Sequence, residues 1–205
     1  TRIEQLRNSS GEADTHGLSN ELVDSFLKID PNLGIALDLA IKARENLDDE
    51  VEDLLLKLTE SQFARELQKD FVNFYEPSTV NPYIPLAAKG PWIITTHGAV
   101  VHDNGGYGML GMGHDPTEVM SSMSESHVMA NVMTPSVTHK RFADTLKREV
   151  GHTRGTCPFD RFICMNSGSE SVTVAMRISD INARLMTDQE GPHQGKEIWT
   201  VALDS

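Results

Sequence analysis

Four stripes of apolar residues at helical spacing run through residues 18–76. The stripes begin at Leu18, Leu33, Val51 and Phe63. Repeats of three or four residues place one apolar face along each predicted helix. Residues 1–17, in contrast, are polar and rich in Ser, Gly and Glu. We therefore expect a disordered or poorly ordered start over 1–17 and a helical N-terminal segment over 18–76.

Prolines and glycines punctuate residues 76–91, which favours an irregular connection there. Two short apolar runs follow at 92–94 and 99–101, and the turn residues between them predict two paired strands. Residues 103–113 are rich in glycine, as is typical of backbone that passes close to another group. Asp115, followed by Pro and later Glu, then predicts the N-cap of a helix.

A further amphipathic helix is predicted over 139–150. After it, residues 166–170 read Asn-Ser-Gly-Ser-Glu, and the apolar run before them, 162–165, is typical of a strand buried in a parallel sheet. An amphipathic segment follows the turn, and the apolar run 198–203 predicts the next strand. Residues 162–203 therefore predict a right-handed βαβ unit, and with it an α/β protein.

The turn at 166–170 has the features of a phosphate-binding site. Gly168 permits close approach of the backbone to a ligand, and the exposed amides at a helix start carry partial positive charge. Ser167 and Ser169 add hydroxyl donors. An ordinary strand-to-helix connection with a serine cap is the alternative interpretation.

Charge and cysteine content narrow the class of protein. The formal charge of −12 over 205 residues argues against nucleic acid or an anionic membrane as the main partner, because both require clustered Lys and Arg. Cys157 and Cys164 match neither a disulfide framework nor zinc-finger spacing. The sequence shows no apolar stretch of membrane-spanning length and no signal-peptide pattern. We expect a cytoplasmic protein without a bound metal.

Residues 106–111 spell the dinucleotide fingerprint G-x-G-x-x-G, which would indicate a nicotinamide-dependent enzyme. That fingerprint must open a helix directly, whereas here more glycine precedes the helix expected after Asp115. We therefore favour the phosphate site at 166–170 over the dinucleotide interpretation.

Three motifs, in the same order along residues 82–205, resemble those of the class III aminotransferases. The first is a pair of strands opened by Gly90-Pro91-Trp92 and closed by His102-Asp103. The second is the passage from Gly106-Tyr107-Gly108 to Gly113-His114-Asp115-Pro116. The third and most specific is Asn166-Ser167-Gly168-Ser169-Glu170, similar to the family's Asn-Ser-Gly-Ser/Thr-Glu-Ala turn. These enzymes depend on pyridoxal phosphate and share fold type I, the aspartate aminotransferase-like fold.

The resemblance implies the start of a fold type I transferase: a mixed, mainly parallel sheet with helices on both faces, preceded by the helical segment. It implies that Ser167, Gly168 and Ser169 hold the phosphate of pyridoxal 5'-phosphate and that Tyr107 lines the substrate pocket. Packing within a glycine-rich loop is the alternative role for Tyr107. Ser171 replaces an Ala that is usual in the family.

By the same resemblance, the lysine that forms the Schiff base with the cofactor lies beyond Ser205. We therefore expect the chain to be the N-terminal portion of a larger enzyme and to be inactive alone. The expected organisation places small-domain strands and the glycine-rich passage in 77–135. The beginning of the large cofactor-binding domain is expected in 136–205.

The expected reaction is transfer of an amino group from an amine or amino acid to a 2-oxo acid, carried out by a homodimer. Family members of this architecture also catalyse mutase, racemase and decarboxylase reactions, which stay as alternatives. Outside enzymes, the alternative is a non-catalytic module that binds a phosphate ligand or another protein.

Overall fold

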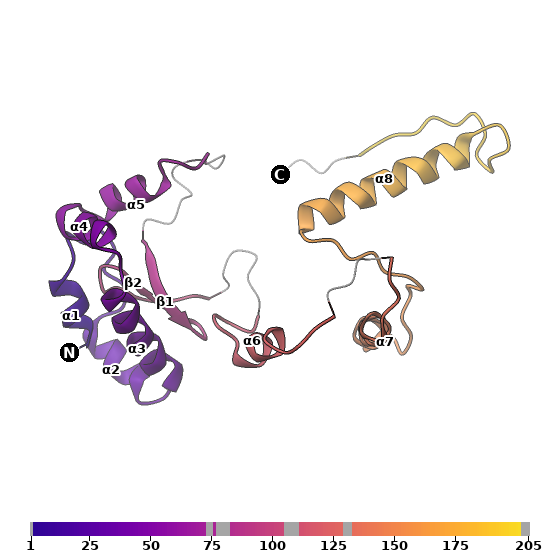
Figure 1. The fold of residues 1–205 in the computed structure, drawn as a ribbon. Helices are drawn as coiled ribbons and strands as arrows, with labels where there is room; N and C mark the ends of the chain where they lie inside the picture. Colours follow the sequence, from indigo (N-terminus) through magenta and orange to yellow (C-terminus); the bar gives the residue numbers. More distant parts are fainter. Residues whose placement is uncertain (1, 73–75, 77–82, 105–110, 129–132, 202–205) are drawn as a thin grey trace. The chain divides into compact units, whose positions relative to one another are not determined.

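A computed structural model describes the chain at residues 2–72, 76, 83–104, 111–128 and 133–201. The chain divides into two compact units, Thr1–His127 and Val128–Ser205. Figure 1 shows the helices and strands of both units as a ribbon.

Helices dominate the first unit. Those described are α1 (Arg2–Asn8), α2 (Asn20–Leu27), α3 (Pro31–Glu45), α4 (Asp49–Lys57), α5 (Glu60–Gln68) and α6 (Thr117–Met123). Ser19 caps α2, Asp30 caps α3 and Thr59 caps α5, each with a side-chain oxygen that accepts a backbone amide of the first turn. The four helices predicted between residues 18 and 76 are confirmed as α2 to α5.

The first unit also contains a three-stranded antiparallel sheet in the order β1-β2-β3. Its strands are β1 (Pro85–Lys89), β2 (Trp92–Thr95) and β3 (Val100–His102). The strands predicted at 92–94 and 99–101 are confirmed as β2 and β3. β1 lies where proline content predicted an irregular connection. Pro85 opens this edge strand, a position where the missing amide costs little.

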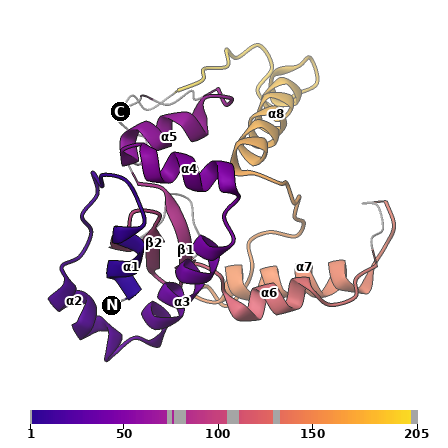
Figure 2. The ribbon, with the colours of Figure 1, turned by 60° about the vertical axis from the view of Figure 1, so that its left-hand side comes forward.

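A hydrophobic core joins α1, α2 and α3 to the sheet in the first unit. Helix α3 packs against β1 and β2, and α1 and α2 pack against α3 (Figures 1 and 2). The buried residues of this core are Ile3, Leu6, Val23, Leu33, Ala36, Leu37, Ala40, Trp92, Ile94 and Val100. The helical segment and the strands that follow it therefore share a core, although their compositions differ.

The start of the chain differs from the expectation of a poorly ordered segment. Residues Arg2–Asn8 form α1, and both Ile3 and Leu6 are buried in the core. Only these two apolar side chains of α1 face inward, which is too short a pattern for a periodicity argument. Burial against α3 stabilises a helix whose local sequence gives little signal.

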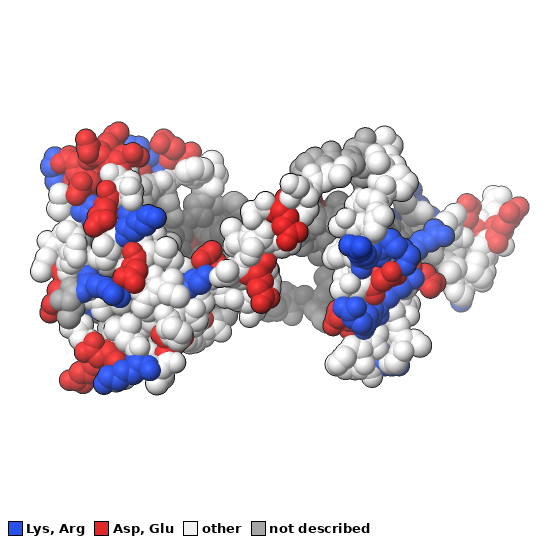
Figure 3. Space-filling model, turned by 60° about the horizontal axis from the view of Figure 1, so that its bottom comes forward, with Lys and Arg blue, Asp and Glu red and all other residues white. Residues whose placement is uncertain are grey.

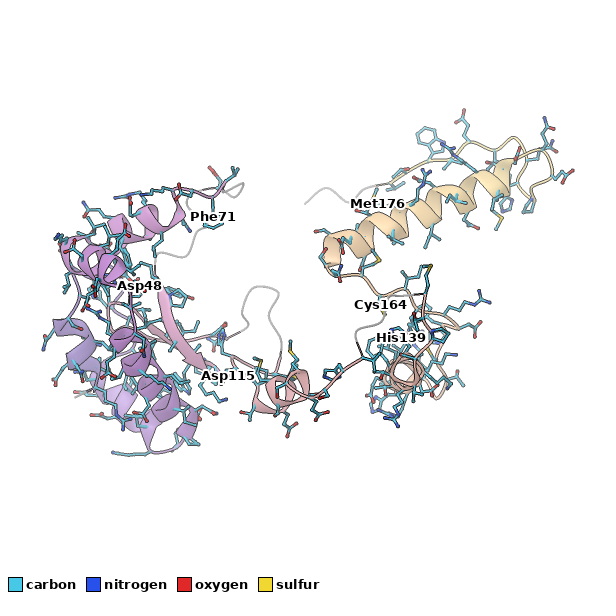
Figure 4. All side chains as sticks on the ribbon, in the orientation of Figure 1. Asp48, Phe71, Asp115, His139, Cys164 and Met176 are labelled. Carbon is cyan, nitrogen blue, oxygen red and sulfur yellow. The ribbon has the colours of Figure 1, made fainter. Side chains whose placement is uncertain are left out.

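Helix α6 begins one residue later than the capping prediction. Pro116 is its N-cap and makes no side-chain cap hydrogen bond, so the prediction that Asp115 caps the helix is wrong. Asp115 instead adopts a left-handed backbone with φ of 47°. Its carboxylate accepts a hydrogen bond from Lys89 at 2.8 Å, which holds Asp115 toward β1. Figure 4 labels Asp115 just ahead of α6.

The described part of the second unit contains α7 (Val137–Gly151) and α8 (Gly168–Thr187). Both helices were predicted from apolar spacing and are confirmed. Ser136 caps α7 and Ser167 caps α8. Much of the apolar surface of α8 is exposed, and Met176, labelled in Figure 4, is 60% accessible.

The two strands expected on either side of α8 are not formed in the part of the second unit that the structure describes. Residues 162–165 and 198–201 have no strand assignment, and residues 202–203 lie outside the described range. Ile163 is 66% exposed, whereas a strand within a parallel sheet would bury it. A strand requires a hydrogen-bonded partner, and the described residues of this unit supply none. The chain thus mixes helices with a sheet, as predicted, but the described sheet is small and antiparallel.

Charge is divided unequally between the units. Residues 1–127 contain 21 acidic and 9 basic residues, whereas residues 128–205 contain 9 of each. The whole formal charge of −12 therefore belongs to the first unit. The face drawn in Figure 3 shows acidic side chains gathered at one end of the first unit and a group of basic side chains on the second.

None of the helices that the structure describes combines the length and apolar character needed to cross a membrane.

Candidate functional site

The N-terminus of α8 carries the residues that the sequence singled out. Ser167 is the N-cap in extended conformation, and its hydroxyl oxygen accepts the amide of Glu170 at 3.2 Å. The carbonyl of Ser167 accepts the amide of Ser171 at 3.1 Å, which closes the first turn. A serine three residues before a glutamate therefore starts this helix by local capping.

Two amides at this terminus are free. The NH groups of Gly168 and Ser169 have no acceptor among the residues that the structure describes. The hydroxyl of Ser169 likewise has no partner within those residues. A Cβ atom added at Gly168 would meet nothing within 4 Å, so the space beside this glycine is open. The free terminus of a 20-residue helix therefore presents three donors to solvent.

Glu170 places a negative charge beside the same donors. One oxygen of its carboxylate accepts the amide of Asn166 at 2.9 Å. Glu170 takes part in the cap through both its amide and its carboxylate. Its negative charge, however, repels a bound anion. A ligand here has to use the amides and the Ser169 hydroxyl while leaving the Glu170–Asn166 bond in place.

The donor set at this terminus fits a phosphate monoester. Three donors at one helix start match the acceptor oxygens of a phosphate group. Ser167, Gly168 and Ser169 are all exposed, so a ligand has access to them. These residues would hold the phosphate of pyridoxal 5'-phosphate, and the repulsion from Glu170 is the feature that works against this fit.

The structure brings Ser167, Gly168 and Ser169 together at one helix start, as expected from their adjacency. Tyr107, the predicted substrate-pocket residue, lies outside the described residues. The dinucleotide fingerprint at 106–111 falls there too, except for Gly111.

Comparisons with known proteins found no similar protein that could test the resemblance. No family model matches the chain, and no match was found among curated proteins or solved structures. The resemblance to class III aminotransferases therefore rests on the residues quoted above.

Within the first unit, a buried polar pair was missed by sequence reasoning. Glu60, the first residue of α5, and His97, in the turn between β2 and β3, are both fully buried. One oxygen of Glu60 accepts the amides of Asp14 at 2.9 Å and Thr15 at 2.7 Å. Its other oxygen lies 4.0 Å from Nδ1 of His97, which is too long for a hydrogen bond.

Burial controls the ionisation of His97. It lowers the pKa of the imidazole, while the nearby carboxylates of Glu60 and Asp14 act in the opposite direction. The Nδ1 atom lies 3.0 Å from the hydroxyl of Thr96. The Nε2 atom has no hydrogen-bond partner in the described part of the chain. Glu60 and His97 are so far apart in the sequence that their pairing leaves no local pattern from which it could be predicted.

A second polar cluster holds the two ends of the glycine-rich passage. Gly90 and His114 exchange two backbone hydrogen bonds, of 2.9 and 2.7 Å. Nε2 of His114 lies 3.0 Å from a carboxylate oxygen of Asp103. The ammonium of Lys89 donates to the hydroxyl of Thr117 at 2.9 Å as well as to Asp115. These contacts join the residues on either side of the passage to β1.

No group of three or more His, Cys, Asp or Glu side chains with metal-binding geometry occurs among the residues described. Both cysteines are free thiols, and Cys164, labelled in Figure 4, precedes α8.

Proposed function

We propose that this chain is the N-terminal part of a pyridoxal-phosphate-dependent aminotransferase, which transfers an amino group from an amine or amino acid to a 2-oxo acid. The observation that carries the proposal is the start of α8, where two free amides and the Ser169 hydroxyl are exposed together. This donor set lies within the Asn-Ser-Gly-Ser-Glu sequence that resembles the family's phosphate-binding turn.

In this proposal the residues at 167–169 anchor the cofactor and do not take part in bond making. The amides of Gly168 and Ser169 and the hydroxyl of Ser169 donate to the phosphate oxygens. Ser167 holds the helix start in place through its bond to the amide of Glu170. When bound, pyridoxal 5'-phosphate supplies an electron sink for chemistry at an amino-bearing carbon.

The assembled enzyme is proposed to be a fold type I homodimer located in the cytoplasm, with Tyr107 lining the substrate pocket. The chain alone is expected to show no transamination.

The experiment that tests the proposal measures binding of the phosphate group without lysine chemistry. Pyridoxine 5'-phosphate carries an alcohol where the cofactor carries an aldehyde, so it does not react with the lysines of the chain. We expect it to bind in equilibrium dialysis, whereas pyridoxine without the phosphate does not. Equal binding of the two compounds, or of neither, would reject the phosphate site.

Two serine variants separate binding from helix capping. Ser169→Ala removes a free donor and is expected to weaken binding about tenfold, the loss of one hydrogen bond to a charged group. Ser171→Ala is the matched control, because its hydroxyl is committed to the carbonyl of Ser167 at 3.0 Å. A matching loss in both variants would show that binding depends on helix stability alone.

A further inference from the structure

The first unit contains a pocket that lies outside the proposed cofactor site. Its volume is about 790 Å³. Helix α1 contributes Arg7, the N-terminus of α2 contributes Ser19 and Asn20, and the turn between β2 and β3 contributes His97. The loop between α1 and α2 completes the wall.

Backbone contacts fix the walls of this pocket. The amide of Gly11 donates to the carbonyl of Leu55 at 2.8 Å, and the amide of Leu18 donates to the carbonyl of Val100 at 2.9 Å. Gly17 adopts φ of +64°, and a Cβ there would lie 2.5 Å from the carbonyl oxygen of Val100. The loop is thus attached to α4 and to β3, so the start of α2 has a defined position beside Arg7.

Donors converge on the pocket from three elements. The amides of Asn20 and Glu21, at the start of α2, have no acceptor among the described residues. Arg7 uses Nε for the carbonyl of Gly98 at 3.2 Å and one terminal nitrogen for the side chain of Asn20 at 2.9 Å. Its other terminal nitrogen makes no hydrogen bond within the described chain.

His97 supplies an observation independent of the helix terminus. The residue is 1% exposed and lines the pocket, yet Nε2 has no partner in the described structure. In the neutral tautomer that accepts the Thr96 hydroxyl at Nδ1, the proton is on Nε2, and that nitrogen is a donor. A buried donor without an acceptor is costly, and a ligand with acceptor oxygens removes that cost.

We propose that this pocket binds a small oxyanion, a phosphate or carboxylate group, through Arg7, the first amides of α2 and Nε2 of His97. The guanidinium supplies the charge, and the amides and the imidazole supply directed donors. Glu21 also lines the pocket and opposes the anion, so the site favours a ligand of low charge. The charge of −12 on the first unit disfavours non-specific anion adsorption elsewhere on it.

The test is a titration of the isotopically labelled 205-residue chain, followed by nuclear magnetic resonance. Sodium phosphate and sodium acetate are the two probes, each compared with sodium chloride at equal ionic strength. We expect saturable shifts of the Asn20 and Glu21 amides and of the His97 ring. Saturation by either oxyanion supports the site and identifies which group it prefers. Shifts that fail to saturate with both probes would overturn it.

Three variants make the test specific. Arg7→Gln is expected to weaken binding at least about tenfold, as for a lost charged hydrogen bond. Arg2→Gln is the matched control on the same helix, because Arg2 is exposed, pairs with Asp38 and does not line this pocket. Glu21→Gln removes the opposing charge and is expected to tighten binding severalfold.

Glu21→Gln also keeps the proposal testable if Arg7→Gln fails to fold, since Arg7 contacts Gly98. The Glu21 side chain makes no hydrogen bond within the described residues, so its replacement leaves the fold intact. Unchanged or weaker binding in Glu21→Gln would reject the site. This result is independent of the cofactor site at α8, because binding is followed at the Asn20 and Glu21 amides and at the His97 ring, which are not part of that site.

Discussion

The carboxylate of Asp14 accepts two hydrogen bonds from Ser61, one from the backbone amide at 3.0 Å and one from the hydroxyl. These two bonds join the loop after α1 to the first turn of α5. The reciprocal contact comes from Glu60, which accepts the amides of Asp14 and Thr15. Loop and helix are therefore held together from both sides by side-chain oxygens.

This relationship predicts loss of stability in acid. The hydrogen bonds from Ser61 lower the pKa of Asp14 below its usual 3.8. Because the pKa of Asp14 is lower in the folded chain than in the unfolded chain, the carboxylate contributes its full stabilisation at pH values above 3.8. This stabilisation is lost as the pH falls from 3.8 through the pKa of the folded chain. Urea denaturation of Asp14→Ala at pH 7 and pH 3 should show the variant losing less stability on acidification than the original chain.

Glu12→Ala is the control for this measurement, because Glu12 lies on the same loop and contributes only its backbone carbonyl to α5. If Glu12→Ala flattens the pH dependence as much as Asp14→Ala does, the effect belongs to general charge and not to the Ser61 contact.

Asp30 provides a prediction on stability at neutral pH. Its carboxylate accepts the indole NH of the buried Trp92 at 2.7 Å and the amide of Asn32 at 2.9 Å, so it joins the cap of α3 to β2. Asp30→Ala removes a cap and leaves a buried donor unpaired, which we expect to cost about 2–4 kcal/mol in the free energy of unfolding.

Urea denaturation followed by the fluorescence of Trp92 measures this cost, in a Trp199→Phe background that removes the exposed second indole. Asp38→Ala on the same helix removes only a surface ion pair with Arg2 and should change stability by less than about 1 kcal/mol. Similar losses in the two variants would contradict the role assigned to the Trp92 contact.

His97 predicts a second pH effect, nearer neutrality. Burial lowers its folded pKa below the usual 6.5, so the unfolded chain takes up a proton first as pH falls. Stability should therefore be complete above pH 6.5 and decline as pH falls from there through the folded pKa. His97→Gln should remove this decline, whereas His16→Gln, an exposed residue of the same pocket, should keep it.

Two glycines distinguish backbone strain from close packing. Gly90 and Gly113 have φ of +57° and +74°. The nearest atoms to a Cβ at Gly90 belong to the side chain of Asn32, at 3.1 Å, whereas a Cβ at Gly113 would lie 2.8 Å from backbone atoms of Gly90. We expect Gly90→Ala to cost about 1–2 kcal/mol, the penalty for a left-handed residue.

Gly113→Ala should cost more than Gly90→Ala, because the backbone of Gly90 cannot move aside without breaking its bonds to His114. If Gly90→Ala and Gly113→Ala lose the same free energy of unfolding in urea denaturation, the left-handed backbone conformation alone accounts for both losses.

Ser167 predicts a local effect at the start of α8. Ser167→Ala removes the acceptor for the Glu170 amide, at a cost of about 1 kcal/mol to the helix start. Hydrogen exchange of the Glu170 amide should accelerate, while exchange in the middle of α8 stays unchanged. Ser169→Ala is the control, because its hydroxyl caps no described amide.

Local signals in the sequence located most helices and two strands. Helix α8 begins at the serine-containing turn where the sequence placed a helix start, because a side-chain cap such as Ser167 acts over three residues and needs no tertiary partner. Prediction of strands 162–165 and 198–203 was wrong for the described residues, because an apolar run carries no information about a pairing partner. Strand β1 was not predicted for the same reason. It forms because it pairs with β2, although it begins with a proline.

The two candidate sites, at the start of α8 and in the oxyanion pocket, also differ in how far they could be predicted from the sequence. The α8 terminus is made of consecutive residues, so its composition was visible in the sequence. The oxyanion pocket combines Arg7 with His97, ninety positions apart, and only the packing of α1 against the sheet turn brings them together. Residues so far apart in the chain share no pattern that spacing could reveal.

The contact between Arg7 and the carbonyl of Gly98 spans 91 positions of the chain. During synthesis α1 leaves the ribosome long before β3. Ile3 and Leu6 therefore cannot be buried against Val100 until β3 has been synthesised. Nascent chains arrested before residue 100 should therefore expose these apolar side chains to chaperones. The order of translation makes β3 the last strand needed to close the core of the first unit.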